Sequence, residues 1–373
     1  MATVPLVFYI PQMSRRASIL PGQRLRARGA DSNQAGRFEA TDREAFDDGW
    51  DLAEDEHLVA TEVRLERPRS ALTFNRSPDV PFDRSINPYR GCEHGCIYCY
   101  ARPSHAFLNL SPGLDFETRL IARPGIADVL EGELRRTSYK VAPVAIGTNT
   151  DPYQPIEREH GLMRQVLQVL AAFRHPVWIT TRGTTIERDI DLIAGMAADG
   201  LASVSISVTT LDEGLARKME PRAPAPKRRL QMIRRLAEAG VPVRVQVSPL
   251  IPALTDHELE AVMEAGRDAG ARAANTIPLR LPQEVADLFR DWLAATLPDR
   301  AERVMGRVRQ LHGGRDYDPE FGKRMRGEGP WADLIHLRAA VARKRLGLEE
   351  GLPALRTDLF SPPPKAGDQL SLF

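Results

Sequence analysis

The sequence predicts an α/β fold built on a parallel sheet, and three observations lead to that class. Short apolar runs alternate with longer amphipathic segments through the middle of the chain, which is the pattern of βαβ units. The amphipathic segments carry helix signals, such as a proline at the start of 124–136 and Gly240 directly after 227–239. The apolar runs number six, which is fewer than the eight strands of a closed barrel.

Each element follows from its own stretch of sequence. The expected strands are short apolar runs, and they cover 85–89, 141–147, 177–181, 202–208, 241–247 and 273–279. The helices expected between them have apolar residues on one face, and they cover 124–136, 159–173, 187–198, 227–239 and 256–269. Beyond Pro282 the pattern is helical throughout, in EVADLFRDWLAATL, RAERVMGRVRQL and WADLIHLRAAVARKRL.

The composition changes along the chain and divides it into four parts. Residues 1–70 are an N-terminal extension, expected to be partly disordered, because clustered arginines, clustered acids and polar residues follow one another there. Residues 71–283 hold the alternating strands and helices, and 284–348 form the helical region. Residues 349–373 are expected to be a flexible tail, rich in proline, glycine and serine until the last five residues.

The bulk composition limits the class of protein. Of the 373 residues, 42% are hydrophobic and 27% charged, which excludes a wholly disordered chain, a collagen and a disulfide scaffold. The 51 basic and 50 acidic side chains nearly cancel, so any binding of nucleic acid would depend on a local patch. No run of about 18 apolar residues occurs, so we expect no membrane partner.

All three cysteines of the chain fall within eight residues, at Cys92, Cys96 and Cys99. Their number is odd and no cysteine lies elsewhere to pair with them, so a disulfide framework is not expected. Thiols persist in a reducing compartment, and we therefore expect a cytoplasmic protein.

Three closely spaced thiolates are suitable ligands for zinc or for an iron–sulfur cluster. A closed structural zinc site takes four ligands, usually as two pairs separated by a longer loop, and this sequence has no second pair. His94 is a candidate fourth ligand, but it lies between the first two cysteines, where binding would strain the loop. Three thiolates on a cubane cluster leave one iron without a protein ligand, which is the open position that a catalytic cluster needs.

The CxxxCxxC spacing of Cys92, Cys96 and Cys99 resembles that of the radical S-adenosylmethionine (radical SAM) superfamily. The resemblance covers about 87–282 and implies a (β/α)6 partial TIM barrel, here with an N-terminal extension and a C-terminal helical region. It also implies that the three cysteines bind a [4Fe-4S] cluster and that S-adenosylmethionine chelates the fourth iron. In this superfamily the aromatic residue before the third cysteine lies near the adenine, and here that residue is Tyr98.

Four longer motifs narrow the resemblance. They are similar to the branch that contains spore photoproduct lyase and its uncharacterised relatives, and they read NPYRGCEHGCIYCYAR, GTNTDPYQPIE, VTTLDEGLARKMEPRAPAP and VSPLIPALTDHE. Residues 315–338 are similar to one uncharacterised bacterial family, from which no activity can be carried over. The lyases use a further cysteine as hydrogen donor, and this sequence has no fourth cysteine. Tyr100 or Tyr153 is the candidate substitute, unless each is a packed aromatic residue.

Further candidates follow the ends of later strands, because ligands bind beyond the carboxyl ends of parallel strands. In the superfamily the end of the second strand meets the amino group of the cofactor. The sequence there is GTNTD, which makes candidates of Asn149, Thr150 and Asp151. The alternative is a hydrogen-bonded Asx turn before Pro152.

The fourth strand has three hydroxyls on one face by its period of two, those of Ser205, Ser207 and Thr209. They would meet the ribose of the cofactor, with Ser207 as the leading candidate, or satisfy one another in a polar layer. Glu220 and Arg222 follow on a loop and are also candidates for the cofactor. Arg222 would pair with the cofactor carboxylate as a bidentate fork, or would be a solvated surface arginine.

Arg280 ends the sixth strand and is expected to act in catalysis together with Tyr100. A buried arginine beside the core of a sheet needs a partner. A phosphate or carboxylate of the substrate would serve, and so would a salt bridge to Asp151 or Glu220.

The last five residues, QLSLF, resemble the pentapeptide by which bacterial DNA polymerases and repair enzymes bind the replication sliding clamp. Leu372 and Phe373 would fill an apolar pocket, and Gln369 would form a hydrogen bond at its rim. The alternative is that the two apolar residues fold back onto their own domain.

These features predict a cytoplasmic bacterial radical SAM enzyme with a substrate related to nucleic acid, in DNA repair. Its partners would be the sliding clamp, nucleic acid and an electron donor such as flavodoxin or ferredoxin. A second hypothesis is the modification of RNA or of a protein by the same radical. A third is a non-enzymatic, zinc-stabilised adaptor on the sliding clamp.

Overall fold

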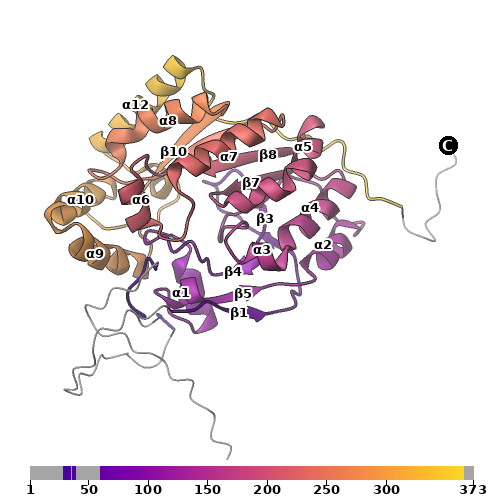
Figure 1. The fold of residues 1–373 in the computed structure, drawn as a ribbon, viewed down its shortest axis with the longest axis horizontal. Helices are drawn as coiled ribbons and strands as arrows, with labels where there is room; N and C mark the ends of the chain where they lie inside the picture. Colours follow the sequence, from indigo (N-terminus) through magenta and orange to yellow (C-terminus); the bar gives the residue numbers. More distant parts are fainter. Residues whose placement is uncertain (1–27, 35, 39–58, 365–373) are drawn as a thin grey trace, which may run out of the picture.

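The structure is a computed structural model that describes residues 28–34, 36–38 and 59–364 (Figure 1). Most of the predicted N-terminal extension and the predicted clamp-binding peptide at 369–373 lie outside the described residues. Within these ranges, no helix is long and apolar enough to cross a membrane.

A seven-stranded sheet forms the centre of the structure, in the order β10-β9-β8-β7-β6-β3-β2. Six strands are parallel: β3 (Arg84–Ile86), β6 (Val144–Ile146), β7 (Val177–Thr181), β8 (Ala202–Ser207), β9 (Val243–Leu250) and β10 (Ala273–Pro278). At one edge, β2 (Leu72–Phe74) is antiparallel to β3. No pairing among the described residues joins β2 to β10, so the sheet does not close. The predicted partial barrel of six parallel strands is confirmed.

The strand predicted over 85–89 is wrong in its second half. β3 ends at Ile86, and Tyr89–Arg90 form a separate strand, β4, in another sheet. Pro88 lies between them, and a proline has no N–H to donate to a strand ladder. This second sheet has the order β1-β5-β4, with β1 at Glu62–Leu65 and β5 at Arg119–Ala122, and it was not among the predicted elements.

Helices pack on the apolar face of the large sheet (Figure 1): α2 (Ile126–Leu134), α4 (Leu162–Ala172), α5 (Ile190–Ala198), α7 (Pro226–Glu238) and α8 (Leu259–Asp268). They match the five predicted helices, apart from their first residues. The helix predicted over 159–173 is divided at Gly161, whose φ of 61° separates α3 (Glu157–His160) from α4. Two others begin as 3-10 turns, η2 (Thr184–Asp189) and η3 (Asp256–Glu258).

The period of two along the strands separates an apolar face from a polar one. In β9, Val243, Val245 and Val247 are buried in the core with the helices. Between them, Arg244 and Gln246 point to the other side of the sheet, where they line a groove. The polar face is therefore available for a binding site, while the apolar face supplies the core.

The C-terminal helices belong to the same body as the sheet. They are α9 (Glu284–Thr296), α10 (Pro298–Leu311), α11 (Lys323–Arg326) and α12 (Pro330–Leu346). α9 packs against α10, and α12 packs against α8 and β10. Ile335 and Ala339 of α12 are buried in the main core, so the helical region 284–348 shares its core with the barrel.

The first part of the predicted flexible tail, residues 349–364, is packed on the barrel. Phe360 contacts Phe173 and His175 in an aromatic cluster, and the N–H of Ser361 donates to the carbonyl of Phe173 at 3.0 Å. This differs from the prediction of a flexible segment, because Phe360 and several backbone hydrogen bonds, such as that from Arg356 to the carbonyl of Gly200 at 3.0 Å, together fix the chain.

Candidate active site

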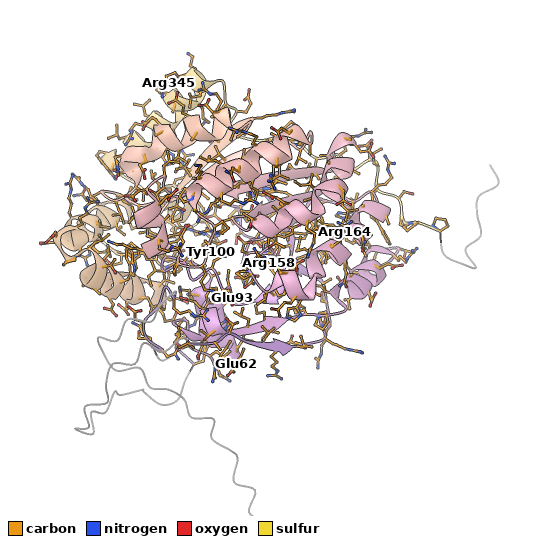
Figure 2. All side chains as sticks on the ribbon, in the orientation of Figure 1. Glu62, Glu93, Tyr100, Arg158, Arg164 and Arg345 are labelled. Atoms are coloured by element: carbon orange, nitrogen blue, oxygen red, sulfur yellow. The ribbon has the colours of Figure 1, made fainter. Side chains whose placement is uncertain are left out.

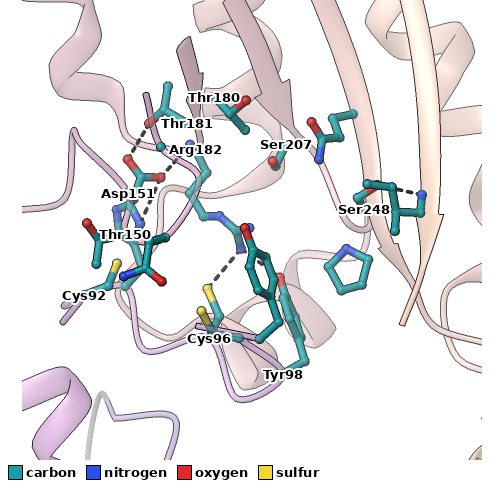
Figure 3. Close-up of a pocket in the computed structure, with 18 of the residues that line it drawn as sticks. Cys92, Cys96, Tyr98, Thr150, Asp151, Thr180, Thr181, Arg182, Ser207 and Ser248 are labelled. Carbon is teal, nitrogen blue, oxygen red and sulfur yellow. Dashed lines mark hydrogen bonds and ion pairs between the residues drawn. The ribbon is translucent and has the colours of Figure 1, made fainter. Parts of the chain in front are cut away.

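Three cysteines lie on the loop that follows β4, and all three line one cavity, here called the cysteine cavity (Figure 3). Cys92 and Cys96 are buried, and Cys99 is half-buried. Gly95 has a φ of 66°, and a Cβ there would lie 2.7 Å from Oε2 of Glu117. Only glycine allows this approach, and the resulting tight turns bring the three thiols to a common wall. Figure 2 shows the neighbouring Glu93 and Tyr100 near the centre of the view.

Arg102 and Glu117 hold the cysteine loop from behind. Arg102 lies in η1 (Arg102–Leu108) and donates from Nε to the carbonyl of Cys96 at 3.0 Å and from Nη2 to Glu117 in α1 (Asp115–Thr118). Glu117 also accepts the backbone N–H groups of Gly29 and Ala30, each at 2.9 Å. Both charged side chains are fully buried and neutralise each other. This group, the rear centre, ties the loop to part of the predicted N-terminal extension.

A second buried carboxylate, Glu220, lies on the other side of the loop, directly after α6 (Glu213–Met219). It accepts hydrogen bonds from Thr209 and Arg182, both at 2.8 Å, and from Tyr98 and Arg229. Burial raises the pKa of Glu220, but Arg229 and Arg182 outweigh burial and bring it to about 2. Burial also holds the pKa of Tyr98 well above its usual value, so its phenol stays protonated. These five side chains form the cavity centre.

Arg182, which follows β7, connects the cavity centre to the cysteines. Its Nη1 lies 3.0 Å from Sγ of Cys96 and 2.8 Å from the hydroxyl of Tyr98 (Figure 3). Burial lowers the pKa of Arg182, but the neighbouring Cys96, Tyr98 and Glu220 outweigh burial and raise it, so the guanidinium stays charged. A cation beside a sulfur favours its thiolate form. The sequence placed Arg182 after a strand, and no pattern in it indicated this contact.

The chemistry of the three thiols fits a cluster of several metal ions. Burial raises the pKa of Cys92, and it raises the pKa of Cys96 to about 12, so both are protonated before metal binds. Metal binding must therefore release these protons. The described residues contain no group of three His, Cys, Asp or Glu side chains placed to hold a single metal ion. Once deprotonated, the three thiolates that line this cavity are suitable ligands for an iron–sulfur cluster.

Gly147 lets the loop after β6 reach the cysteine cavity. Its φ is 89°, and a Cβ there would lie 1.9 Å from the carbonyl oxygen of Thr180 on the next strand. Asn149 follows and lines the cavity, and its side chain makes no hydrogen bond within the described part of the chain. Thr150 lines it too, but its hydroxyl donates to the carbonyl of Tyr89 at 3.1 Å. Of the two predicted residues, only Asn149 has its polar group available to a ligand.

Asp151 lines the same cavity, but protein donors occupy its carboxylate. It accepts from the hydroxyl of Thr181 at 2.5 Å, the backbone of Arg182 at 2.8 Å and the backbone of Tyr153 at 2.9 Å, and the last bond closes an Asx turn. Nδ1 of His94, the candidate fourth ligand, lies 3.4 Å from Asp151. Burial raises the pKa of Asp151, but His94 and the other donors outweigh burial and bring it to about 2.

The three hydroxyls predicted on one face of the fourth strand have three different environments. Ser207 lines the cysteine cavity. Ser205 lies deeper and accepts hydrogen bonds from Nε1 of Trp178 at 3.0 Å and Nε of Arg244 at 3.1 Å. Thr209 belongs to the cavity centre. Of the three, Ser207 alone is placed to contact a ligand in the cysteine cavity.

Arg222 does not line the cysteine cavity. Its Nη2 lies 2.9 Å from Oε1 of Glu93, and its backbone N–H donates to the carbonyl of His94 at 3.3 Å. The predicted bidentate pair with a cofactor carboxylate does not agree with this position, because Arg222 lies outside the cavity and its Nη2 already contacts Glu93. Arg222 fastens the cysteine loop instead.

Arg280 and Tyr100 lie together where the cysteine cavity opens. The guanidinium carbon of Arg280 lies 4.4 Å from the ring centroid of Tyr100, and 45% of Tyr100 is exposed. Within the described ranges Arg280 forms no ion pair, so neither predicted salt bridge, to Asp151 or to Glu220, is present. Its charge is therefore available to a ligand.

The cysteine cavity encloses about 850 Å³, its opening included, and continues into a wider groove of about 3110 Å³. Seven residues line both spaces: Tyr100, Gly147, Asn149, Thr180, Gln246, Ile277 and Arg280. The wider space is here called the arginine groove, because seven arginines line it: Arg67, Arg69, Arg90, Arg123, Arg244, Arg280 and Arg324. Its lining contains a single carboxylate, that of Glu66.

Comparison with known proteins agrees with this geometry. An uncharacterised protein of Mycobacterium tuberculosis (strain ATCC 25618 / H37Rv) is 38% identical over 262 residues, which cover 69% of this chain and 75% of that protein. An uncharacterised protein of Methanocaldococcus jannaschii is 26% identical over 173 residues, 46% of this chain and 62% of that protein. A solved spore photoproduct lyase variant has a similar fold, with a TM-score of 0.57 at 14% identity over 77% of this chain and 81% of that chain.

The model of the radical SAM superfamily matches residues 86–266, which extend from the end of β3 into α8. The matched segment contains the cysteine loop and the strand ends around the cysteine cavity. The chain belongs to the radical SAM superfamily, whose cofactors are a [4Fe-4S] cluster and S-adenosylmethionine.

Proposed function

We propose that this chain is a radical SAM enzyme acting on a nucleic-acid substrate, in a reaction related to DNA repair. Cys92, Cys96 and Cys99 hold the [4Fe-4S] cluster in this proposal, because their thiols share one wall of the cysteine cavity. S-adenosylmethionine occupies the rest of that cavity, beyond the carboxyl ends of the parallel strands.

The predicted cofactor-binding residues divide into two groups. Asn149 and Ser207 line the cavity with available polar groups and contact the cofactor in this proposal. Protein partners occupy the polar groups of the others, which position the site: Tyr98, Thr150, Asp151, Glu220 and Arg222. The ring of Tyr98 still lines the cavity, where the superfamily places the adenine.

When bound, a reduced [4Fe-4S] cluster held by the three cysteines together with S-adenosylmethionine would supply a 5′-deoxyadenosyl radical able to take a hydrogen atom from the substrate. The chain sets the charge around this chemistry. Arg182 keeps a positive charge 3.0 Å from Sγ of Cys96, and Glu220 fixes that guanidinium in place.

The arginine groove is the observation that carries the nucleic-acid assignment. Its lining has seven arginines against one carboxylate, in a chain whose net charge is only +1. Phe107, Tyr100 and Trp178 line it as well. Arginines that meet phosphates and aromatic rings that stack on bases are the means by which proteins bind single strands. A spore photoproduct lyase of similar fold, 15% identical with a TM-score of 0.54, was solved with a dinucleoside spore photoproduct, which supports this substrate class.

Tyr100 is the proposed hydrogen donor in place of the further cysteine of the lyases. It lines both the cysteine cavity and the arginine groove, next to Arg280. Both phenols donate a hydrogen bond within the protein, Tyr100 to the carbonyl of Thr148 and Tyr153 to Oδ2 of Asp189, but Tyr153 is buried and lines neither space, as expected of a packed aromatic residue.

Anaerobic reconstitution tests this function. We expect about four irons with matching sulfide per chain. With a reductant and S-adenosylmethionine, single-stranded DNA should raise the release of 5′-deoxyadenosine above its level without substrate. Raising the salt from 50 to 200 mM should weaken this effect strongly, because arginine–phosphate contacts are salt-dependent. Stimulation by RNA or by a protein alone would support the second hypothesis. Stoichiometric zinc without sulfide would favour the clamp adaptor.

Residues 369–373 carry a separate proposal, docking on the bacterial sliding clamp. A peptide of this sequence should bind the clamp with micromolar affinity, about −8 kcal/mol. Phe373→Ala should cost roughly 2 kcal/mol, because an aromatic residue in an apolar pocket is a typical hot spot. Removing 369–373 should abolish co-purification with the clamp and leave the iron content unchanged. Loss of iron would show that the peptide is a structural cap.

For the radical SAM reaction proposed above, the electron donor is a flavodoxin or a ferredoxin.

A further inference from the structure

The polar face of β9 carries an arginine, Arg244, that has no acidic partner among the described residues. Its Nε donates to Oγ of Ser205 at 3.1 Å, and its guanidinium carbon lies 4.9 Å from the ring centroid of Trp178. Nη1 and Nη2 form no hydrogen bond within the described ranges. Burial lowers the pKa of Arg244 to about 10, so it is still charged at neutral pH.

Some arginines near the two spaces are neutralised by carboxylates, whereas four others that line the groove form no ion pair among the described residues, namely Arg67, Arg69, Arg123 and Arg280. Arg182 and Arg229 pair with Glu220. Arg324, which lines the arginine groove with Arg244, donates from Nε and Nη2 to Asp79 at 2.7 and 2.6 Å. A half-buried cation without a counter-ion is costly to keep, so an anionic partner from outside the described residues would stabilise Arg244.

The surroundings of Arg244 have room for such a partner and a second polar group to hold it. On β10, the small Ala273 lies beside Arg244 in register, and Asn275 lies beside Gln246. Oδ1 of Asn275 is buried and has no hydrogen-bond partner. Arg244, Trp178 and Asn275 all line the arginine groove.

The position of Arg244 along its strand separates it from the cofactor. Gln246 lines both the cysteine cavity and the arginine groove, whereas Arg244 lines only the groove. Arg244 precedes Gln246 by two residues, so it lies roughly 7 Å further from the cysteine cavity along the strand. A group bound at Arg244 can therefore belong to the same molecule that reaches the cavity at Gln246 and Tyr100.

We infer that Arg244, Trp178 and Asn275 form a phosphate subsite, which holds one nucleotide of the substrate by its phosphate while the reacting nucleotide lies at the cysteine cavity. The inference rests on the proposed function. Nη1 and Nη2 of Arg244 form a planar fork that matches two phosphate oxygens. Oδ1 of Asn275 accepts a hydrogen bond from a sugar hydroxyl or a base N–H of the same nucleotide. Trp178 fixes the guanidinium by stacking.

Calorimetric titration of the reconstituted full-length protein tests the subsite with three probes: thymidine 5′-phosphate, thymidine and inorganic phosphate. The wild type should bind thymidine 5′-phosphate at least tenfold more tightly than thymidine. Arg244→Gln should abolish this difference and the binding of inorganic phosphate, with thymidine affinity unchanged. Arg244→Lys should restore part of the preference for thymidine 5′-phosphate, because lysine returns the positive charge without the forked pair of guanidinium donors. Arg228→Gln is the matched control, since Glu187 already holds that arginine at 2.6 and 2.7 Å and Arg228 lines neither space, and it should behave as the wild type.

Several outcomes would overturn the subsite. Equal affinities for the nucleotide in Arg244→Gln and wild type would do so, and so would an equal loss in Arg228→Gln. A loss of S-adenosylmethionine binding in Arg244→Gln would assign the arginine to the cofactor instead. These results are distinguishable from failure of the proposed function. If DNA stimulates 5′-deoxyadenosine release equally in Arg244→Gln and wild type, the subsite alone is wrong. If no nucleic acid stimulates the wild type, the proposed function is wrong.

Discussion

The rear centre and the cavity centre hold the cysteine loop from opposite sides, with different kinds of donor. In the rear centre, two of the donors to Glu117 are backbone N–H groups, from residues 29 and 30. In the cavity centre, every hydrogen bond that the carboxylate of Glu220 accepts from the described residues comes from a side chain, and two of those side chains are arginines. Backbone donors fix the path of the chain, whereas charged side chains also set the potential around a site.

The two centres meet at Cys96. Arg102 of the rear centre donates to its carbonyl at 3.0 Å, and Nη1 of Arg182 in the cavity centre lies 3.0 Å from its sulfur. Cys96 is therefore held at two of its atoms for two different purposes. The rear centre places the main chain of the loop, and the cavity centre controls the charge at the thiol.

Replacing Cys96 should have the largest effect on the cofactor. Cys96→Ala removes the sulfur but keeps the carbonyl that Arg102 uses, so the rear centre should stay intact. We expect loss of most of the iron and of 5′-deoxyadenosine release, with the unfolding temperature of the metal-free protein nearly unchanged. Iron analysis and thermal unfolding measure the two effects separately. Full iron content in this variant would show that Cys96 is not a ligand.

Replacing each of the two glutamates by glutamine should separate an effect on the free energy of unfolding from an effect on the reduction potential of the cluster. Glu117→Gln and Glu220→Gln each leave buried arginine charge uncompensated, and each should lower the free energy of unfolding by about 3–5 kcal/mol. Glu220→Gln should also raise the reduction potential of the cluster, because a negative charge near Cys96 is lost. Glu117→Gln should change the reduction potential much less, because its partner Arg102 contacts the carbonyl of Cys96 and not a sulfur. Equal shifts in potential would contradict the division between the two centres.

A buried histidine, His175, lies just before the central strand β7, and its titration should have a smaller, pH-dependent effect on stability. Nε2 of His175 accepts from the hydroxyl of Tyr139 at 2.7 Å, and its Nδ1 donates to the carbonyl of Pro176 at 3.0 Å. Burial lowers the pKa of His175 from 6.5 to about 4. Between these values the unfolded chain binds a proton that the folded chain does not, so stability should fall by about 3 kcal/mol as the pH drops from 6.5 to 4.

Urea unfolding between pH 7 and pH 4.5 measures how steeply the free energy of unfolding falls as the pH drops. His175→Gln should make this dependence on pH less steep. Glu220 should contribute little in that window. Its pKa is depressed, to about 2, so its stabilisation is present above its ordinary value near 4.5 and is lost only at lower pH. An unchanged slope in His175→Gln would show that other groups dominate the pH dependence.

Local patterns made most of the fold predictable. Five of the six strands and all five surrounding helices follow from periodicity within a few residues, as the agreement at Val177–Thr181 shows. The second sheet was missed because its strands are two to four residues long and pair at a distance, and β4 follows a proline. The packing of Phe360 was missed for a related reason, since a lone aromatic residue in a polar stretch has no period.

The site was predictable where chemistry depends on spacing and unpredictable where it depends on contact. The cysteines and Asn149 follow from a motif and a strand end. The contact of Arg182 with Cys96 spans 86 residues, and nothing in the sequence distinguishes this arginine from its many neighbours of the same type. The role expected for Arg222 failed because Glu93, inside the cysteine motif itself, competes for its charge.

The close approach of Gly29 to the cysteine loop has a consequence for the biogenesis of the enzyme. A Cβ at this position would lie 1.7 Å from the carbonyl oxygen of Gly95, and its N–H bonds a side chain 88 residues later. On the ribosome, Gly29 therefore emerges long before the residues that receive it. Once it docks, the fully buried rear wall separates the thiols from solvent on that side. An assembly factor that delivers iron and sulfide to the finished fold would then approach through the mouth of the cysteine cavity, which is also the entrance proposed above for the substrate.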